Sequence, residues 1–169
     1  MHSAYVLASG GHRVGKQIAH ALNTAISYAV RKGILIAEWA AVWELNVMSY
    51  VRSIRAALPH LRASRGAIVN VSSTAGKRPS VGMPHYSVTK AAVLSLSRLV
   101  ADAYASDGVR CNAVTPGPTA TAAWLGRGGL ADQQGGDREQ VLAKVGAGRP
   151  LGRLAAPEEI AAVIAFLAS

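Results

Sequence analysis

The chain has 169 residues, half of them hydrophobic, which is enough for one domain with a buried core and argues against a disordered chain. A single cysteine, Cys111, excludes an intrachain disulfide and is expected as a buried thiol, and no apolar run approaches the roughly 20 residues needed to cross a bilayer. The formal net charge of +9 permits a phosphate-bearing cofactor or a nucleic acid as partner, but the basic residues are scattered, which favours dispersed surface charge.

The first predicted unit is a strand, a glycine-rich turn and a helix. Residues 4–8 form a short apolar run, and apolar residues recur at helical spacing over residues 16–30. The turn between them holds Gly10, Gly11, Arg13 and Gly15. Such a turn can offer backbone N–H groups and a helix N-terminus to a phosphate. These glycines do not form a GxGxxG motif, so a plain strand-to-helix turn is an equal alternative.

A long amphipathic helix is predicted over residues 38–64, where apolar residues follow a 3.6-residue period. Pro59 should kink this helix or cap its usable length, because proline cannot donate a backbone hydrogen bond. Asn46 is a polar side chain within the apolar stretch. Its amide is either satisfied locally or turned toward a functional site.

The most informative stretch covers residues 66–90. A buried strand is predicted over residues 67–71, followed by the polar pair Ser72–Ser73, a loop rich in Gly and Pro, and a helix whose first turns carry Tyr86 and Lys90. Residues four apart share one helix face, so the phenol and the ammonium point to one place. The serine pair faces the crevice in which open α/β sheets bind ligands. This layout suits proton transfer to or from an alcohol or carbonyl oxygen.

The last third of the chain is predicted to continue the α/β pattern. The helix ends near Gly108, and a strand follows over residues 109–117. The glycine-rich residues 118–137 are predicted as a loop, which would suit a mobile lid over a ligand. A short helix is predicted over residues 138–145, and Pro157 opens a final apolar helix with acids in its first turn.

Four motifs in register resemble the classical short-chain dehydrogenase/reductase family: NVSS, YSVTK, NAVTPG and RPLGRLAAPEEIAAVIAFLAS. Their spacing from Asn46 also fits, and the resemblance covers residues 38–169. It implies a Rossmann-type parallel sheet flanked by helices in one partial domain over residues 1–169. It also implies an NAD(P)-dependent oxidoreductase that transfers hydride between a nicotinamide and an alcohol or carbonyl substrate.

The resemblance also assigns roles to single residues. Tyr86 would be the general acid/base, and Lys90 would lower its pKa and hold the nicotinamide ribose, since a free phenol is a poor base at neutral pH. Ser73 would hydrogen-bond the substrate oxygen, and Asn46 would hold a water in a proton relay to Lys90. The cofactor, NADP or NAD, would be bound by Gly10, Gly11, Arg13, Gly15, Tyr86, Lys90, Pro116, Gly117 and Thr121. Arg13 and the acid-free residues 45–101 favour NADP, and no metal is implied.

The front of the chain departs from the family pattern. The stretch between Gly15 and Asn46 is too short for the two further strands and their helices found in an intact member. One alignment takes residues 4–8 as the first strand of the family, and a rival alignment makes residues 5–11 a later strand. We therefore expect an incomplete sheet that lacks several strands of the N-terminal half and the last strand.

Three functional hypotheses follow from this combination. The first is the oxidoreductase, acting on a small-molecule alcohol or carbonyl. The alternatives are an inactive family fragment that associates through its helices with a full-length relative, and a basic nucleic-acid-binding domain. We also expect a cytoplasmic protein without a signal peptide or membrane contact. A homo-oligomer, dimer or tetramer, is expected through the helices around residues 38–63 and 85–107.

Overall fold

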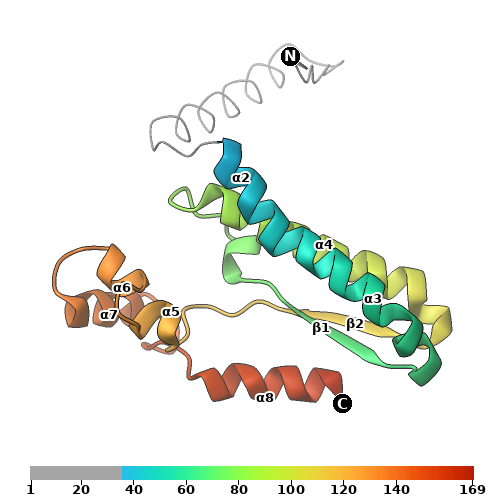
Figure 1. Ribbon diagram of the computed structural model, residues 1–169. Helices are drawn as coiled ribbons and strands as arrows, with labels where there is room; N and C mark the ends of the chain where they lie inside the picture. The colour runs from blue at the N-terminus through green and yellow to red at the C-terminus, as the bar shows by residue number, and fades with distance from the viewer. Residues whose placement is uncertain (1–35) are drawn as a thin grey trace, which may run out of the picture. The chain divides into compact units, whose positions relative to one another are not determined.

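The structure is a computed structural model that describes residues 36–169 (Figure 1). The chain divides into two compact units, residues 1–41 and 42–169, and the second unit contains the sheet and every helix from α3 onward. The strand and helix expected over residues 4–8 and 16–30, and the choice between their two alignments, lie outside the described residues. Within residues 36–169, no helix combines the length and apolar character needed to cross a membrane.

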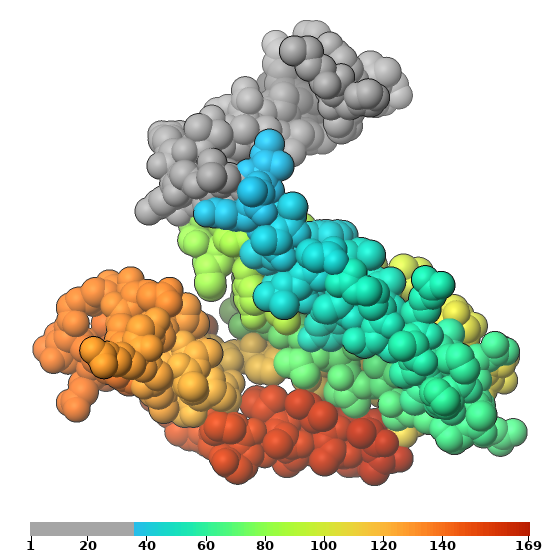
Figure 2. Space-filling model, viewed as in Figure 1, coloured from blue at the N-terminus to red at the C-terminus, as the bar shows by residue number. Residues whose placement is uncertain are grey.

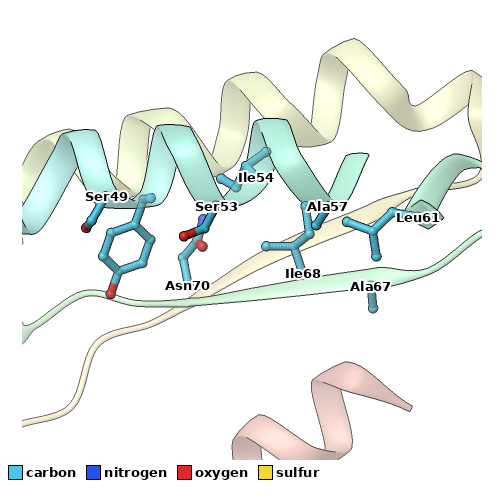
Figure 3. Close-up of a pocket in the computed structure, with 9 residues that line it drawn as sticks. Ser49, Ser53, Ile54, Ala57, Leu61, Ala67, Ile68 and Asn70 are labelled. Atoms are coloured by element: carbon cyan, nitrogen blue, oxygen red, sulfur yellow. The ribbon is translucent and has the colours of Figure 1, made fainter. Parts of the chain in front are cut away.

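The predicted long helix is present in three consecutive parts. These are α2 (Ile36–Trp43), the π-helix η1 (Glu44–Met48) and α3 (Ser49–Ser64). Of the two alternatives for Pro59, the cap is wrong, since α3 continues to Ser64 and is capped by Arg65, whose φ of 53° is left-handed. The kink stays a prediction. Apolar side chains on both sides of Pro59, including Ile54 and Leu61, face β1 around a cavity of about 380 Å³ (Figure 3). Pro59 is thus accommodated inside a continuous helix.

The sheet of the described residues consists of two parallel strands. β1 (Ala67–Val71) is the predicted strand, and β2 (Arg110–Val114) covers most of the next one. The register pairs Ala67 with Arg110 and Val71 with Val114. Helices α3 and α4 lie on one side of the pair and α8 on the other (Figure 1). This confirms a parallel α/β sheet flanked by helices, of which two strands are described.

Helix α4 (Pro84–Tyr104) is the predicted helix that begins beside Tyr86, and it packs against both strands. Its buried positions include small or β-branched residues, such as Thr89, Val93 and Ser97, which let the helix approach the sheet closely. The 3-10 turn η3 (Ala105–Asp107) follows it. A core cluster forms where α3, α4 and β2 meet, at Ile54, Val100 and Cys111, so the expected buried thiol is confirmed.

The segment after β2 is more ordered than its glycine content suggests. It contains α5 (Ala122–Leu125), α6 (Leu130–Gln133) and α7 (Arg138–Ala147) before the final helix α8 (Pro157–Ala168). The prediction of a loop over residues 118–137 is therefore wrong for α5 and α6. Local hydrogen bonds form these short helices, such as Trp124 N–H to the Thr121 carbonyl at 2.9 Å. The predicted α8, with proline first and acids in its first turn, is confirmed.

Candidate active site

A cavity of about 1210 Å³ lies at the carboxyl ends of β1 and β2. The surface is hollowed between the green segment that leads into α4 and the orange segment that holds α5 to α7 (Figure 2). Every predicted site residue within residues 36–169 borders this cavity, namely Asn46, Ser73, Tyr86, Lys90, Pro116, Gly117 and Thr121. The predicted residues Gly10, Gly11, Arg13 and Gly15 lie outside the described part of the chain.

Lys90 lies at the floor of the cavity and is only 8% exposed. Its Nζ donates a hydrogen bond of 3.0 Å to the Val71 carbonyl and lies 5.6 Å from the centroid of the Tyr86 ring. Among residues 36–169, no carboxylate forms an ion pair with Lys90. Burial lowers the pKa of Lys90, because desolvation disfavours the charged ammonium.

Tyr50 is a second aromatic neighbour of Lys90, and it is not among the residues predicted from the sequence. Its hydroxyl donates to the same Val71 carbonyl at 2.9 Å, and Lys90 Nζ lies 5.7 Å from its ring centroid. Burial raises the pKa of Tyr50, and the nearby Tyr86 adds to that rise. The signal that could have found Tyr50 is its position four residues after Asn46 in one long helix.

The two serines after β1 have different environments. Ser72 is buried, and its hydroxyl donates at 2.7 Å to the backbone carbonyl of Lys90, which ties the end of β1 to α4. Ser73 is half-buried, and its Oγ accepts a hydrogen bond from the Ala75 N–H at 3.1 Å. A hydroxyl both accepts and donates, so Ser73 keeps a proton that it can donate to a ligand in the cavity.

Asn46 lies in the π-helix η1, an irregularity that often occurs at functional sites. Its side-chain nitrogen donates to Thr89 Oγ1 at 3.1 Å, and Thr89 Oγ1 in turn donates to the Tyr86 carbonyl at 2.8 Å. Thr89 is completely buried. These two bonds connect η1 to the turn of α4 that carries Tyr86, and they leave the Asn46 side-chain oxygen available as an acceptor.

Gly76 ends the 3-10 helix η2 (Thr74–Gly76) and was also missed from the sequence. A Cβ atom at this position would lie 2.8 Å from both the carbonyl carbon and the carbonyl oxygen of Lys90. Only glycine therefore allows η2 to approach the backbone of α4 this closely. The contact holds the loop after Ser73 against the helix turn that ends in Lys90.

The cofactor-side residues predicted after β2 lie beside the serine corner, the name used here for residues 71–76. The Thr74 N–H donates to the Pro116 carbonyl at 3.0 Å, so parallel pairing continues past the ends of the strands. The Thr119 hydroxyl donates to the Gly117 carbonyl at 3.0 Å, and Thr119 pairs with Ala155 in an isolated parallel bridge. Thr121 then immediately precedes α5.

The cavity therefore combines a phenol, a buried ammonium and a serine hydroxyl at one sheet edge. Such a set can donate a proton to an oxygen atom, or accept one from it, while a second hydroxyl holds that oxygen. Trp124 and Leu130 add large apolar side chains to the wall, whereas the equally apolar Leu125 does not border the cavity. Within residues 36–169, no group of His, Cys, Asp and Glu side chains could hold a metal ion.

Comparison with known proteins places these features in context. A family model described as "Enoyl-(Acyl carrier protein) reductase" matches residues 16–169. The chain is 38% identical over 133 residues to 4-formylbenzenesulfonate dehydrogenase of Comamonas testosteroni, covering 78% of this chain and 51% of that protein. It is 42% identical over 135 residues to cis-4-hydroxycyclohexanecarboxylate dehydrogenase of Sinomonas cyclohexanicum, covering 79% and 50%.

The fold is similar to a solved structure of L-sorbose reductase from Gluconobacter frateurii, complexed with NADPH and L-sorbose. The TM-score is 0.73 at 35% sequence identity, and the match covers 80% of this chain and 52% of that one. The chain thus spans about half the length of the relatives that it matches.

Proposed function

The chain belongs to the short-chain dehydrogenase/reductase family, and we propose that its cavity is the catalytic centre of an NAD(P)-dependent alcohol/carbonyl oxidoreductase. The observation that supports this most is the meeting of Ser73, Tyr86 and Lys90 at one cavity, at the carboxyl ends of parallel strands. Open α/β sheets bind their ligands at this edge. The names of the two dehydrogenases above give substrates with a formyl group and a hydroxyl group, respectively.

In the proposed reaction, Tyr86 donates its phenolic proton to the carbonyl oxygen during reduction and takes it back during alcohol oxidation. Ser73 donates a hydrogen bond to the same oxygen and so holds it near the phenol. The Lys90 ammonium, 5.6 Å from the Tyr86 ring, stabilises the phenolate that remains after proton transfer. Asn46 would use its free side-chain oxygen to hold a water that returns a proton through Lys90.

The cofactor fits the described half of the site. The cavity is large enough for a nicotinamide ribose and a small substrate together, and Pro116, Gly117 and Thr121 border it beside Tyr86 and Lys90. When bound, NADPH or NADH supplies the hydride that the protein itself lacks. The L-sorbose reductase structure contains NADPH, which supports NADP as the cofactor here. Gly10, Gly11, Arg13 and Gly15 are proposed to bind its phosphates.

Nucleotide binding and turnover test this proposal separately. We expect NADPH or NADH to bind the purified chain in calorimetry, and a panel of aldehydes and ketones to be reduced with loss of absorbance at the nicotinamide band. Tyr86→Phe should lower turnover by about 10²- to 10⁴-fold. Tyr50→Phe is the matched control. This substitution also removes a phenol beside Lys90, but Tyr50 does not border this cavity.

Two results would contradict the proposal. If neither NADPH nor NADH binds, the chain does not use this cofactor. If the Tyr86→Phe variant is as active as the parent, Tyr86 is not the proton donor. Nucleotide binding without turnover of any carbonyl would instead favour the non-catalytic family member that associates with a longer relative. Such a chain should co-purify with that relative when the two are expressed together.

We also propose that residues 1–169 act as one family domain in the cytoplasm, assembled as a homo-oligomer. Val88 and Leu99 on α4 are 47% and 65% exposed, so this helix presents apolar surface that a second copy could cover. Light scattering during size-exclusion chromatography should show a dimer or tetramer, and Leu99→Glu should shift it toward the monomer. A parent chain that is strictly monomeric would refute this assembly.

A further inference from the structure

Among residues 36–169, the charged side chains that border the proposed active-site cavity are all basic. Arg78, Lys90 and Arg149 border it, and no aspartate or glutamate of the described residues does. Lys90 lies at the floor and is already used in the proposed chemistry, but the two arginines have no role there. A cavity whose walls carry one sign of charge concentrates ligands of the opposite sign.

Arg78 lies on the loop that follows η2 and borders the same cavity as Ser73. Its backbone N–H donates to the Thr74 carbonyl at 2.8 Å, which holds the loop close to the serine corner. Its side chain is exposed, and it has no carboxylate partner among residues 36–169. The acid-free composition of residues 45–101 explains this, because no acidic residue lies nearby in the sequence.

Arg149 comes from the connection between α7 and α8, far from Arg78 in the sequence. The backbone N–H of Arg149 donates to the Gly146 carbonyl at 2.9 Å. A Cβ at Gly146 would lie 3.1 Å from the Arg153 Cα, so this turn is tightly packed. Arg149 is also exposed and unpaired within the described residues, whereas Arg138 and Arg153 on either side of it each pair with a carboxylate.

Two unpaired guanidinium groups therefore border the cavity from different segments, together with the apolar side chains of Trp124 and Leu130. Guanidinium binds carboxylate and sulfonate oxygens through paired, charge-assisted hydrogen bonds. We propose that the substrate of this site is an alcohol or carbonyl compound with a small apolar body and an anionic group. Arg78 and Arg149 would bind the anionic group while the reacting oxygen faces Ser73 and Tyr86. This inference rests on the proposed oxidoreductase function.

The phosphates of the cofactor share this chemistry with a substrate carboxylate, so the test must separate the two sources. The probe is a matched pair of aldehydes, 4-formylbenzoate and its neutral methyl ester, assayed with NADPH. We expect kcat/KM for the anionic member to exceed that for the ester by about tenfold or more. Arg78→Gln and Arg149→Gln should each reduce this preference, mainly by raising the Michaelis constant of the anionic aldehyde, while the Kd for NADPH is unchanged.

Arg127→Gln is the matched control, since Arg127 lies in the same part of the chain as Trp124 but does not border the cavity. It should leave the preference unchanged. Equal kcat/KM for the two aldehydes in the parent would overturn the proposal. It would also be overturned if the arginine variants weakened NADPH binding and kept the preference, because the guanidinium groups would then serve the cofactor.

A direct binding measurement distinguishes failure of the anion site from failure of the proposed function. If the parent reduces no aldehyde, the proposed function fails, but calorimetry can still measure the binding of 4-formylbenzoate and of its ester to the full chain. Binding of the acid that is about tenfold tighter than that of the ester, and lost in Arg149→Gln, would support the anion site. Equal binding of both compounds, or of neither, would refute it.

Discussion

Two walls of the cavity proposed as the active site are held in different ways. The serine corner is bound to α4 by contacts between segments that are distant in sequence. Ser72 donates to the Lys90 carbonyl, Lys90 donates to the Val71 carbonyl, and Gly76 packs against the Lys90 backbone. The cover segment, defined as residues 118–152, is held mainly by short-range bonds, such as that from the Gly128 N–H to the Asp132 carboxylate at 2.7 Å.

Because of this difference, we expect changes in the serine corner to affect the proposed reaction and changes in the cover segment to affect substrate binding. Lys90, whose ammonium belongs to the proposed proton-transfer site, is placed by a bond that forms only when β1 and α4 meet. A change there should therefore disturb the fold or the reaction. The cover segment contributes Trp124, Leu130 and Arg149 to the cavity from elements that are stabilised locally. Substitutions in that segment should alter the choice of substrate with little loss of stability.

The largest effect is expected from Lys90→Met, which removes the ammonium from the serine corner. Turnover should fall by about 10²-fold or more, because the Tyr86 phenolate loses its neighbouring positive charge. The variant should be at least as stable as the parent at pH 7. Burial lowers the pKa of Lys90, so the buried charge destabilises the folded parent at pH 7. This destabilisation disappears as the pH rises toward the ordinary pKa of 10.5.

Urea unfolding at pH 7 and pH 10, together with NADPH oxidation, would check this result. The stability difference between Lys90→Met and the parent should move in the parent's favour as the pH rises. A variant that unfolds far more readily at pH 7 would contradict it, since the bond from Lys90 to the Val71 carbonyl would then outweigh the desolvation cost.

The next effect is expected from Gly76→Ala, again in the serine corner. The added methyl group would lie 2.8 Å from the Lys90 carbonyl, so η2 must move away from α4, and we expect a loss of about 1–3 kcal/mol in the free energy of unfolding. Gly82→Ala is the control, because the nearest contact of its Cβ would be the Ser80 Oγ at 3.6 Å. Equal stability of the two variants in urea titrations would show that the corner tolerates displacement.

A smaller effect is expected from Thr89→Val, which keeps the shape of the buried side chain but removes its hydroxyl. The Asn46 side chain then loses its acceptor in α4, at a cost of about 1 kcal/mol. Thr89→Ser retains the hydroxyl and should restore this bond. Urea titration of the three proteins checks the prediction, which fails if the valine variant is as stable as the parent.

The smallest effect is expected from Glu159→Gln, at the ion pair between α8 and Arg153, the residue that directly follows the cover segment. The Arg153 guanidinium and the Ala156 N–H lower the pKa of Glu159 to about 2, from an ordinary value of 4.5. The carboxylate therefore contributes stability above pH 4.5, and that contribution is lost as pH falls toward 2. Melting temperatures of parent and variant should differ slightly at pH 7 and converge near pH 2. A difference that persists at pH 2 would contradict this origin.

Local patterns predicted the elements with strong periodicity and clear boundaries. The strand over residues 67–71 has the predicted bounds, and α8 begins at Pro157 as expected. The weakly patterned segment over residues 118–137 was predicted less well, because two helices of four residues each leave no periodic signal among so many glycines. For Pro59, the alternative of a cap is wrong because α3 continues through the proline to Ser64.

The sequence by itself determined which reactive groups share a face. Tyr86 and Lys90 lie four residues apart, and the helical period is a local property of the backbone, so their common direction followed without knowledge of the fold. The resemblance of four motifs then identified the family.

The tertiary structure decided how those groups are supported and what else borders the cavity. Tyr50 shares the Val71 carbonyl with Lys90, Gly76 rests against α4, and Arg78 and Arg149 border one cavity from distant parts of the chain. None of these contacts could be predicted from the spacing of the residues along the sequence. They arise because parallel pairing brings the carboxyl ends of β1 and β2 together and carries the segments that follow them to the same edge.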